Sequence, residues 1–95
     1  MPALLSVTVE IKNPDRLKTY IAQAPATMAP HGAKMVARGK ISKHIDGSRG
    51  HHIEALFEFP TAEAIDAWYN SDAYQALIPL RDEAANITIS VLDPI

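Results

Sequence analysis

The sequence predicts an α+β domain in which a four-stranded antiparallel sheet carries both helical segments on one face. Strand-like segments near the start, middle and end of the chain alternate apolar and polar residues, the period-two pattern of a strand buried on one side. Between them lie segments with apolar residues at helical spacing behind a capping residue. At 95 residues, 47% of them apolar, the chain is predicted to form a single domain over residues 1–95.

The first strand and helix are predicted from the N-terminal residues. Residues 4–11 place four apolar side chains on one strand face and polar ones on the other. The Asn-Pro-Asp run at residues 13–15 supplies a capping side chain, a preset φ and a carboxylate near the positive end of a helix dipole. We expect Pro25 and Pro30 to break this helix, and Gly32 to end it in the left-handed conformation. Its apolar stripe consists of Leu17, Tyr20, Ile21 and Ala24.

The middle of the chain predicts two strands joined as a hairpin. The second strand covers residues 34–45 with a kink at Gly39, and turn residues occupy positions 46–50. The third strand covers residues 51–59, and Leu56 is the one apolar exception on its polar face.

The last third predicts a second helical region and a final strand. Pro60 stops the third strand, and Thr61 is a natural N-cap for a helix. Ser71 can cap a further helical segment, which Pro79 is expected to break or bend. The inward stripe of the helix consists of Ile65, Trp68 and Tyr69, and the alternating apolar residues of the final strand are Ile87, Ile89 and Val91.

This order of elements is the split βαβ arrangement of a ferredoxin-like fold. We expect the first and third strands to lie parallel at the centre of the sheet, with right-handed crossovers placing both helices on one face. The second face is then uncovered in a monomer, and it is either solvated or a wet dimer interface. Its residues are Ser6, Thr8, Glu10, His52, Glu54, Leu56, Glu58, Thr88, Ser90 and Leu92.

Composition and charge exclude several classes of function. The net charge is -2 and no basic cluster is denser than residues 40–43, so we predict no nucleic-acid partner. No leader is evident and no stretch approaches the ~18 apolar residues of a membrane span, so we predict neither export nor insertion. The absence of cysteine excludes disulfides, thiolate metal sites and cysteine nucleophiles, and it favours a reducing compartment, the cytoplasm.

Several short motifs resemble the family catalogued as domain of unknown function 1330. One departure is Lys40 after Gly39, where family members commonly have a second glycine. The resemblance implies a homodimeric α/β-barrel of two ferredoxin-like subunits. That superfamily includes cofactor-free monooxygenases, lactone isomerases and haem-dependent enzymes, so no activity is implied. The motifs are EFPTAEA at 58–64, WYNS at 68–71, YQAL at 74–77, Arg81, the MPA opening at 1–3, APA at 24–26, His31-Gly32 and Arg38-Gly39.

A ligand site is expected between the helices and the sheet. Aromatic residues would wall it, although Trp68 and Tyr69 also suit core packing, and Tyr74 suits either role. Polar side chains would orient a ligand. The candidate ligand-binding residues are His31, Arg38, Trp68, Tyr69, Ser71, Tyr74 and Arg81.

The polar candidates each have a structural alternative. An arginine fork suits a carboxylate or an enol, so Arg38 and Arg81 favour such a ligand. Alternatively, they form salt bridges with Glu54, Glu58 or Asp82. His31 precedes Gly32 at a helix end, where it can cap the helix or act as an acid or base.

Metal and cofactor sites are not predicted. His51 and His52 are neighbours on a strand and point to opposite faces, so they cannot chelate one ion. His44 and His51 would face each other only in one hairpin register, and no third ligand is near. There is no glycine-rich phosphate loop, and Ser71 has no evident histidine and acid partners for a hydrolase triad.

The sequence therefore predicts a ferredoxin-like dimer that binds a small carboxylate-bearing or aromatic molecule, with cofactor-independent enzyme activity as an extension of that hypothesis. The alternative is a non-catalytic binding or assembly module whose pocket is filled by its own side chains. An open cavity reached by Arg38 or Arg81 would favour the first hypothesis, and a space closed by aromatic rings would favour the second.

Overall fold

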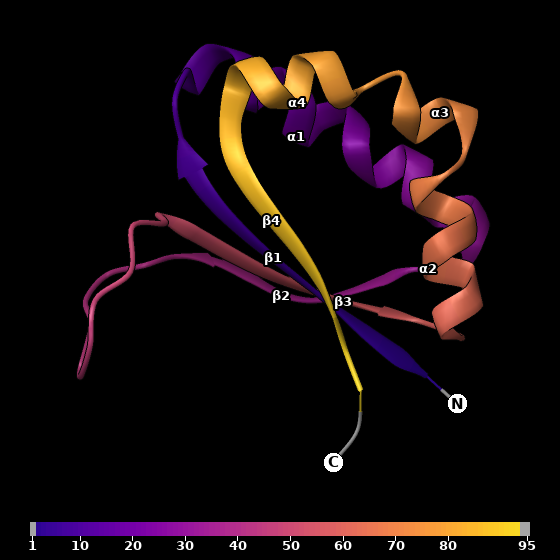
Figure 1. Cartoon of the computed structure of the whole chain (residues 1–95), viewed down its shortest axis with the longest axis horizontal. Helices are drawn as coiled ribbons and strands as arrows, with labels where there is room; N and C mark the ends of the chain where they lie inside the picture. Colours follow the sequence, from indigo (N-terminus) through magenta and orange to yellow (C-terminus); the bar gives the residue numbers. More distant parts are fainter. Residues whose placement is uncertain (1, 94–95) are drawn as a thin grey trace.

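The computed structural model describes residues 2–93 and has the predicted α+β class, with the helices on one side of a sheet (Figure 1). The single-domain prediction also covers Met1, Pro94 and Ile95, which lie outside the described residues. The elements in chain order are β1 (Ala3–Ile11), α1 (Pro14–Met28), the 3-10 helix η1 (Ala29–His31), β2 (Lys34–Lys40), β3 (Ile53–Phe59), α2 (Ala62–Tyr69), α3 (Asp72–Gln75), α4 (Ile78–Ala84) and β4 (Ala85–Leu92).

The four strands form one sheet in the order β2-β3-β1-β4, and every neighbouring pair is antiparallel. The expectation that the first and third strands are parallel is wrong, because β1 and β3 run in opposite directions with Val7 opposite Ala55. The reason is the connectivity. The crossover through α1 returns the chain so that β2 runs in the same direction as β1, and the following loop reverses it before β3.

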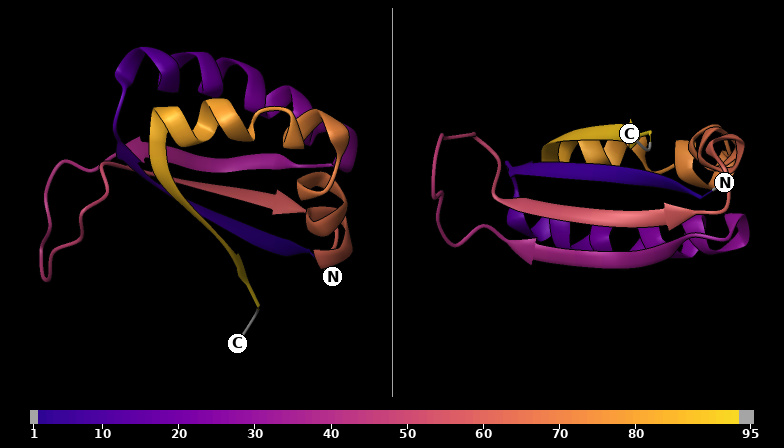
Figure 2. Two further views of the ribbon diagram at one scale, coloured as in Figure 1. Left: turned by 45° about the horizontal axis from the view of Figure 1, so that its top comes forward. Right: turned by 90° about the horizontal axis from the view of Figure 1, so that it is seen from below.

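The alternation of the strands directs their apolar side chains toward the helices. Leu5 and Phe59 on the two central strands are fully buried, and Trp68 and Tyr74 from the helix layer are buried against this core. Among residues 2–93, no helix lies over the opposite face of the sheet, as the view from below shows (Figure 2, right). On the edge strand β2, all seven residues are exposed.

The first helix is longer than predicted, because Pro25 does not break it. Asn13 accepts a hydrogen bond from the Arg16 N–H, as expected for the N-cap, and α1 then continues to Met28. Proline costs a helix one hydrogen bond. Here the last turn is retained, because Ala24 and Met28 on either side of Pro25 are buried in the core.

The second strand is shorter than predicted and its irregularity lies elsewhere. It ends at Lys40 instead of residue 45, and its register with β3 shifts between Met35 and Ala37, not at Gly39. The third strand begins at Ile53 and pairs antiparallel with β2, so the predicted hairpin is confirmed, but a long loop joins its strands in place of the short predicted turn. The loop is mostly polar and Ile45 in it is 94% exposed, so there is no apolar face whose burial would extend the strand pair.

The second helical region follows the predicted caps, with one correction. Thr61 and Ser71 cap α2 and α3 by accepting hydrogen bonds from backbone N–H groups. Pro79 lies in the first turn of α4 and does not bend or break a helix, because its missing N–H has no partner there in any case. The break falls before it, between α3 and α4.

Gly32 ends the first helical region in the predicted left-handed conformation, with φ of 79°. A Cβ atom at this position would lie 2.7 Å from Cγ of Pro60. Strain and overlap together should make Gly32→Ala lower the free energy of unfolding by about 2 kcal/mol or more in urea titrations.

The matched control is Gly39→Ala, because no atom lies within 4 Å of the Cβ position there. In a strand, this change should leave the free energy of unfolding unchanged or raise it by up to about 1 kcal/mol. Equal losses in the two variants would contradict the structural role assigned to Gly32.

Candidate functional site

A cleft of about 330 Å³ opens between the β4 side of the sheet and the helices α2 and α4. Its floor is aliphatic and its rim is polar. The floor residues are Leu5, Ile65, Ile87, Ile89 and Val91, the aromatic walls are Trp68 and Tyr69, and the polar groups are Asp66, Asn70 and Arg81.

Arg81 is the cation of this cleft, and α4 holds its side chain at 15% exposure. Its Nη1 donates to the hydroxyl of Tyr74 at 3.2 Å, and its guanidinium carbon lies 5.9 Å from the centre of the Tyr74 ring. Nη2 lies 3.4 Å from Oδ1 of Asp82, one of the predicted salt-bridge partners. Because Asp82 is 67% exposed, solvent screens this pair and it contributes little energy.

The charge of Arg81 is stabilised where it lies. Burial by itself lowers the pKa of its guanidinium, but the neighbouring phenol groups of Tyr69 and Tyr74 raise this pKa by more. The net direction is upward, so Arg81 is a permanent cation beside an apolar floor. Such a group attracts an anionic ligand more strongly than an exposed arginine does.

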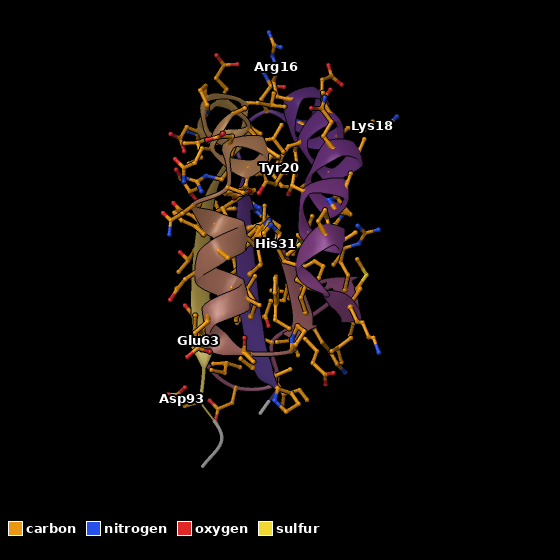
Figure 3. All side chains as sticks on the ribbon, turned by 90° about the vertical axis from the view of Figure 1, so that its right-hand side faces the viewer. Arg16, Lys18, Tyr20, His31, Glu63 and Asp93 are labelled. Carbon is orange, nitrogen blue, oxygen red and sulfur yellow. The ribbon has the colours of Figure 1, made fainter. Side chains whose placement is uncertain are left out.

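A hydrogen bond behind Arg81 joins two phenols. The hydroxyls of Tyr20 on α1 and Tyr74 on α3 lie 2.8 Å apart in the core. Figure 3 shows Tyr20 pointing inward between the helices, whereas Arg16 and Lys18 of the same helix project outward. Burial, followed by the hydrogen bond with Tyr74, raises the pKa of Tyr20 well above its ordinary value.

Sequence reasoning assigned Tyr20 only to an apolar stripe and missed its part in this site. One signal in the sequence could have indicated it: a tyrosine in a buried stripe needs a hydrogen-bond partner for its hydroxyl. Tyr74 is fully buried, so it supports Arg81 from behind and does not line the cleft itself.

Trp68 serves both as core and as wall. It is 2% exposed, and its ring lies 4.4 Å from that of Tyr74 and 5.7 Å from that of Phe59, measured between centroids. Its indole N–H donates to Oγ1 of Thr27 at 3.0 Å, a partner that the sequence did not indicate. Tyr69 is partly exposed and borders the cleft. The two roles that the sequence left open for Trp68 are therefore combined in one side chain.

Arg38 lies on the other side of the helix layer. It borders a smaller apolar cavity of about 70 Å³ between α1 and the sheet, which Trp68 also lines. Arg38 and Arg81 are therefore not brought together. Each borders its own space, and the two spaces share Trp68, Ile87 and Ile89 in their linings.

The remaining candidates lie outside both spaces. The hydroxyl of Ser71 is already used in two structural hydrogen bonds, because it donates to the Trp68 carbonyl at 2.6 Å and accepts from the Tyr74 N–H at 3.3 Å. His31 ends η1 and borders neither cavity. Neither residue is positioned to contact a ligand in the cleft.

His51 and His52 have separate local partners. His51 lies 2.6 Å from Oε1 of Glu54, and Nδ1 of His52 accepts the Ile11 N–H at 3.0 Å. Within residues 2–93 no group of three metal-ligating side chains converges. No helix in this part of the chain is long and apolar enough to cross a membrane.

Comparison with known families shows which family the chain belongs to. The model of the family described as Domain of unknown function (DUF1330) matches residues 2–95. The chain belongs to this family. Among curated proteins, no sequence match to this DUF1330 member is found.

Solved structures share the fold of this DUF1330 protein at low sequence identity. A protein of unknown function from Rhodopseudomonas palustris is 17% identical with a TM-score of 0.82, and the match covers 99% of this chain and 82% of that one. A dimeric ferredoxin-like protein of unknown function from Jannaschia sp. CCS1 is 16% identical with a TM-score of 0.79, covering 99% and 100%. These matches confirm the predicted ferredoxin-like fold.

One structural neighbour of the DUF1330 protein has a described activity. A variant of SnoaB, a cofactor-independent oxygenase from Streptomyces nogalater, is 7% identical with a TM-score of 0.72. The match covers 98% of this chain and 92% of SnoaB. At this identity the likeness shows the fold alone.

The Tyr20–Tyr74 bond generates a prediction about stability. Tyr20→Phe should lower the free energy of unfolding by about 1 kcal/mol at pH 7, because one buried hydrogen bond is lost. The folded-state pKa of Tyr20 is raised, so the stabilising contribution of the neutral phenol is complete below pH 10 and is lost as the pH rises above it. Urea titrations at increasing pH should therefore show the difference between the parent and the variant narrowing above pH 10. A difference that stays constant or widens would contradict this assignment.

Proposed function

We propose that this chain binds a small aromatic carboxylate in the cleft between β4 and the helices, with Arg81 holding the carboxylate. The observation that carries the proposal is the placement of an arginine side chain, only 15% exposed, beside an open cleft with an aliphatic floor and a polar rim. An arginine presents parallel N–H donors that match a carboxylate in two-point geometry. The residues that recognise the ligand in this proposal are Arg81, Tyr69 and Trp68.

The support for a bound anion is that the nitrogens of the Arg81 guanidinium have partners of unequal strength. Tyr74 accepts from Nη1, and the exposed Asp82 is a weak partner for the other nitrogens at 3.4 Å. A ligand carboxylate that displaces Asp82 would exchange a screened ion pair for one shielded by the cleft. Tyr74 would stay in place behind Arg81 and keep the fork oriented.

The support for an aromatic ligand comes from the walls. Tyr69 presents a partly exposed ring, Trp68 lines the wall at 2% exposure, and the aliphatic floor offers apolar area to a flat molecule. The cleft volume of about 330 Å³ falls in the lower part of the range of small-molecule sites. The cleft is not closed by the aromatic rings, which favours ligand binding over the alternative of an assembly module with a filled core.

Cofactor-independent chemistry on such a ligand is a second part of the proposal. Its support is the fold likeness to SnoaB, which is described as a cofactor-independent oxygenase. This likeness supports a shared fold and does not specify a reaction, because function depends on the residues of the site.

A homodimer is the third part of the proposal. Similar structures from Jannaschia and Thermobifida fusca are described as dimeric. The uncovered sheet face carries apolar residues among polar ones, including half-buried Leu4 and Leu56 and the 43% exposed Leu92. A second copy would cover these residues and leave the carboxylates at a wet interface. The cytoplasmic location and the absence of a nucleic-acid partner stay predictions from composition.

The proposed ligand site is tested by substitution of Arg81. Benzoate should bind the parent protein and alter the fluorescence of Trp68, the one tryptophan of the chain and a wall of the cleft. Arg81→Gln should weaken benzoate binding on the order of tenfold or more, because a charged hydrogen-bond donor pair is lost. Fluorescence titration and calorimetry provide the two measurements.

Arg16→Gln is the matched control. This exposed arginine lies 3.6 Å from Glu83 and does not line the cleft, so its loss removes the same charge without removing a lining residue. The control should bind benzoate as the parent does. Absence of benzoate binding to the parent, or equal weakening in both variants, would overturn the proposal.

The proposed dimer is tested by a charge on the open face. The parent should sediment at micromolar concentration with the mass of two chains, and Leu56→Glu should sediment as one chain, because it buries a carboxylate at the interface. Ile45→Glu is the control, since Ile45 is 94% exposed in the loop after β2. A parent that sediments as a monomer would refute the dimer, and circular dichroism would establish that each variant is folded.

A further inference from the structure

The apolar cavity beneath α1 is a separate space with its own opening. It lies between α1 and the sheet, where residues of all four strands line it, and it adjoins the Arg81 cleft at Trp68, Ile87 and Ile89. Nearly all of its lining is aliphatic, aromatic or methionine side chain. A cavity of this kind does not hold water well, because water needs polar partners.

The opening lies at the edge strand β2. Met35 on this strand lines the cavity and is 47% exposed, so the apolar lining continues to the protein surface. Met28 of α1 lines the cavity from the helix side and is buried. Methionine side chains adapt to differently shaped apolar groups, so Met28 and Met35 suit the walls of a passage for an apolar chain.

Arg38 stands at this opening with its charge uncompensated. Arg38 on β2 pairs with Ala55 on β3, and Ala55 is buried on the helix-facing side of the sheet. The side chain of Arg38 therefore leaves its strand on the same, helix-facing side. Across residues 2–93, the salt bridges present involve other residues. An apolar cavity with one free guanidinium at its mouth is complementary to a molecule with an anionic head and an apolar tail.

The volume limits the length of that tail. The cavity measures about 70 Å³. A water-sized group takes up roughly 30 Å³ in the liquid, so roughly two or three such groups fit inside, and any further carbons of a tail lie in the passage beside Met35. A methylene group is of similar size. The tail is therefore a short alkyl chain, and a long fatty acid or a fused ring system is too large.

We propose that this cavity is a second ligand site, for a short-chain aliphatic monocarboxylate whose carboxylate meets Arg38 and whose tail lies beneath α1. This inference goes beyond the Arg81 site and does not depend on it. The two sites share Trp68, Ile87 and Ile89 in their linings, so binding at either one changes the surroundings of the same indole ring.

Hexanoate is the probe for the test. Titration with the full-length parent should change the fluorescence of Trp68 and saturate, whereas acetate, which has the head without the tail, should bind at least tenfold more weakly. Arg38→Gln should weaken hexanoate on the order of tenfold, because the charged hydrogen bonds to the carboxylate are lost. Arg81→Gln should bind hexanoate as the parent does.

Lys40→Gln is the matched control for charge. Lys40 lies two residues further along β2 and pairs with Ile53, so it starts from the same side of the sheet as Arg38 but does not line the cavity. It should bind hexanoate as the parent does. If Arg38→Gln and Lys40→Gln weaken hexanoate binding equally, the effect of Arg38 is general electrostatic attraction, and the proposal is overturned.

Ala24→Leu tests the tail subsite. Ala24 lines the cavity and is buried, so a larger side chain there should fill the space and abolish hexanoate binding while benzoate binding at the Arg81 cleft is unchanged. If this variant does not fold, the Arg38 and Lys40 pair decides. The proposal fails if hexanoate does not bind the parent, if acetate binds equally well, or if Arg81→Gln and not Arg38→Gln removes binding.

Discussion

The packing of Trp68 is the interaction on which both cavities depend. The indole ring lies between Phe59 of the sheet and Tyr74 of the helix layer, and its N–H bond to Thr27 ties α2 to α1. A large rigid ring in this position sets the spacing between the layers. The space that the remaining side chains do not fill lies on either side of it, as the cleft toward β4 and the cavity toward β2.

A polar network crosses the helix layer close to this ring. Arg81, Tyr74 and Tyr20 join α4, α3 and α1 through two hydrogen bonds. Buried polar groups are costly when they lack partners, and in the described residues no buried side-chain nitrogen or oxygen lacks one. The network therefore orients Arg81 without leaving an unsatisfied phenol behind it. A guanidinium held from behind loses less conformational freedom when it binds a carboxylate than a mobile surface arginine does.

The arrangement explains how one small scaffold can present two chemically different openings. Among the described residues, the helices lie over one sheet face only (Figure 2). The cleft lies beside the edge strand β4, and the cavity reaches Met35 and Arg38 on the other edge strand, β2. One arginine lies near each edge, Arg38 on β2 and Arg81 beside β4. The fold shared with other ferredoxin-like proteins places the openings, and these side chains decide which ligands suit them.

Much of the fold follows from local sequence rules. The alternation in β1, β3 and β4 and the caps at Asn13, Thr61 and Ser71 were all predicted, because these signals act over a few residues. The errors came where a distant partner decided the outcome. Burial of Met28 retained the helix turn after Pro25, and the connectivity of the whole sheet made the two central strands antiparallel.

By itself, the sequence determined the α+β class, the order of elements, the family and most of the residue types that the cavities use. Only the tertiary structure decided which of these residues meet. It brought Arg81 to Tyr74 and Tyr74 to Tyr20, 54 positions away, and it separated Arg38 from Arg81. The physical reason is that periodicity specifies the face on which a side chain lies, whereas its hydrogen-bond partner and the space beside it depend on how separate elements pack.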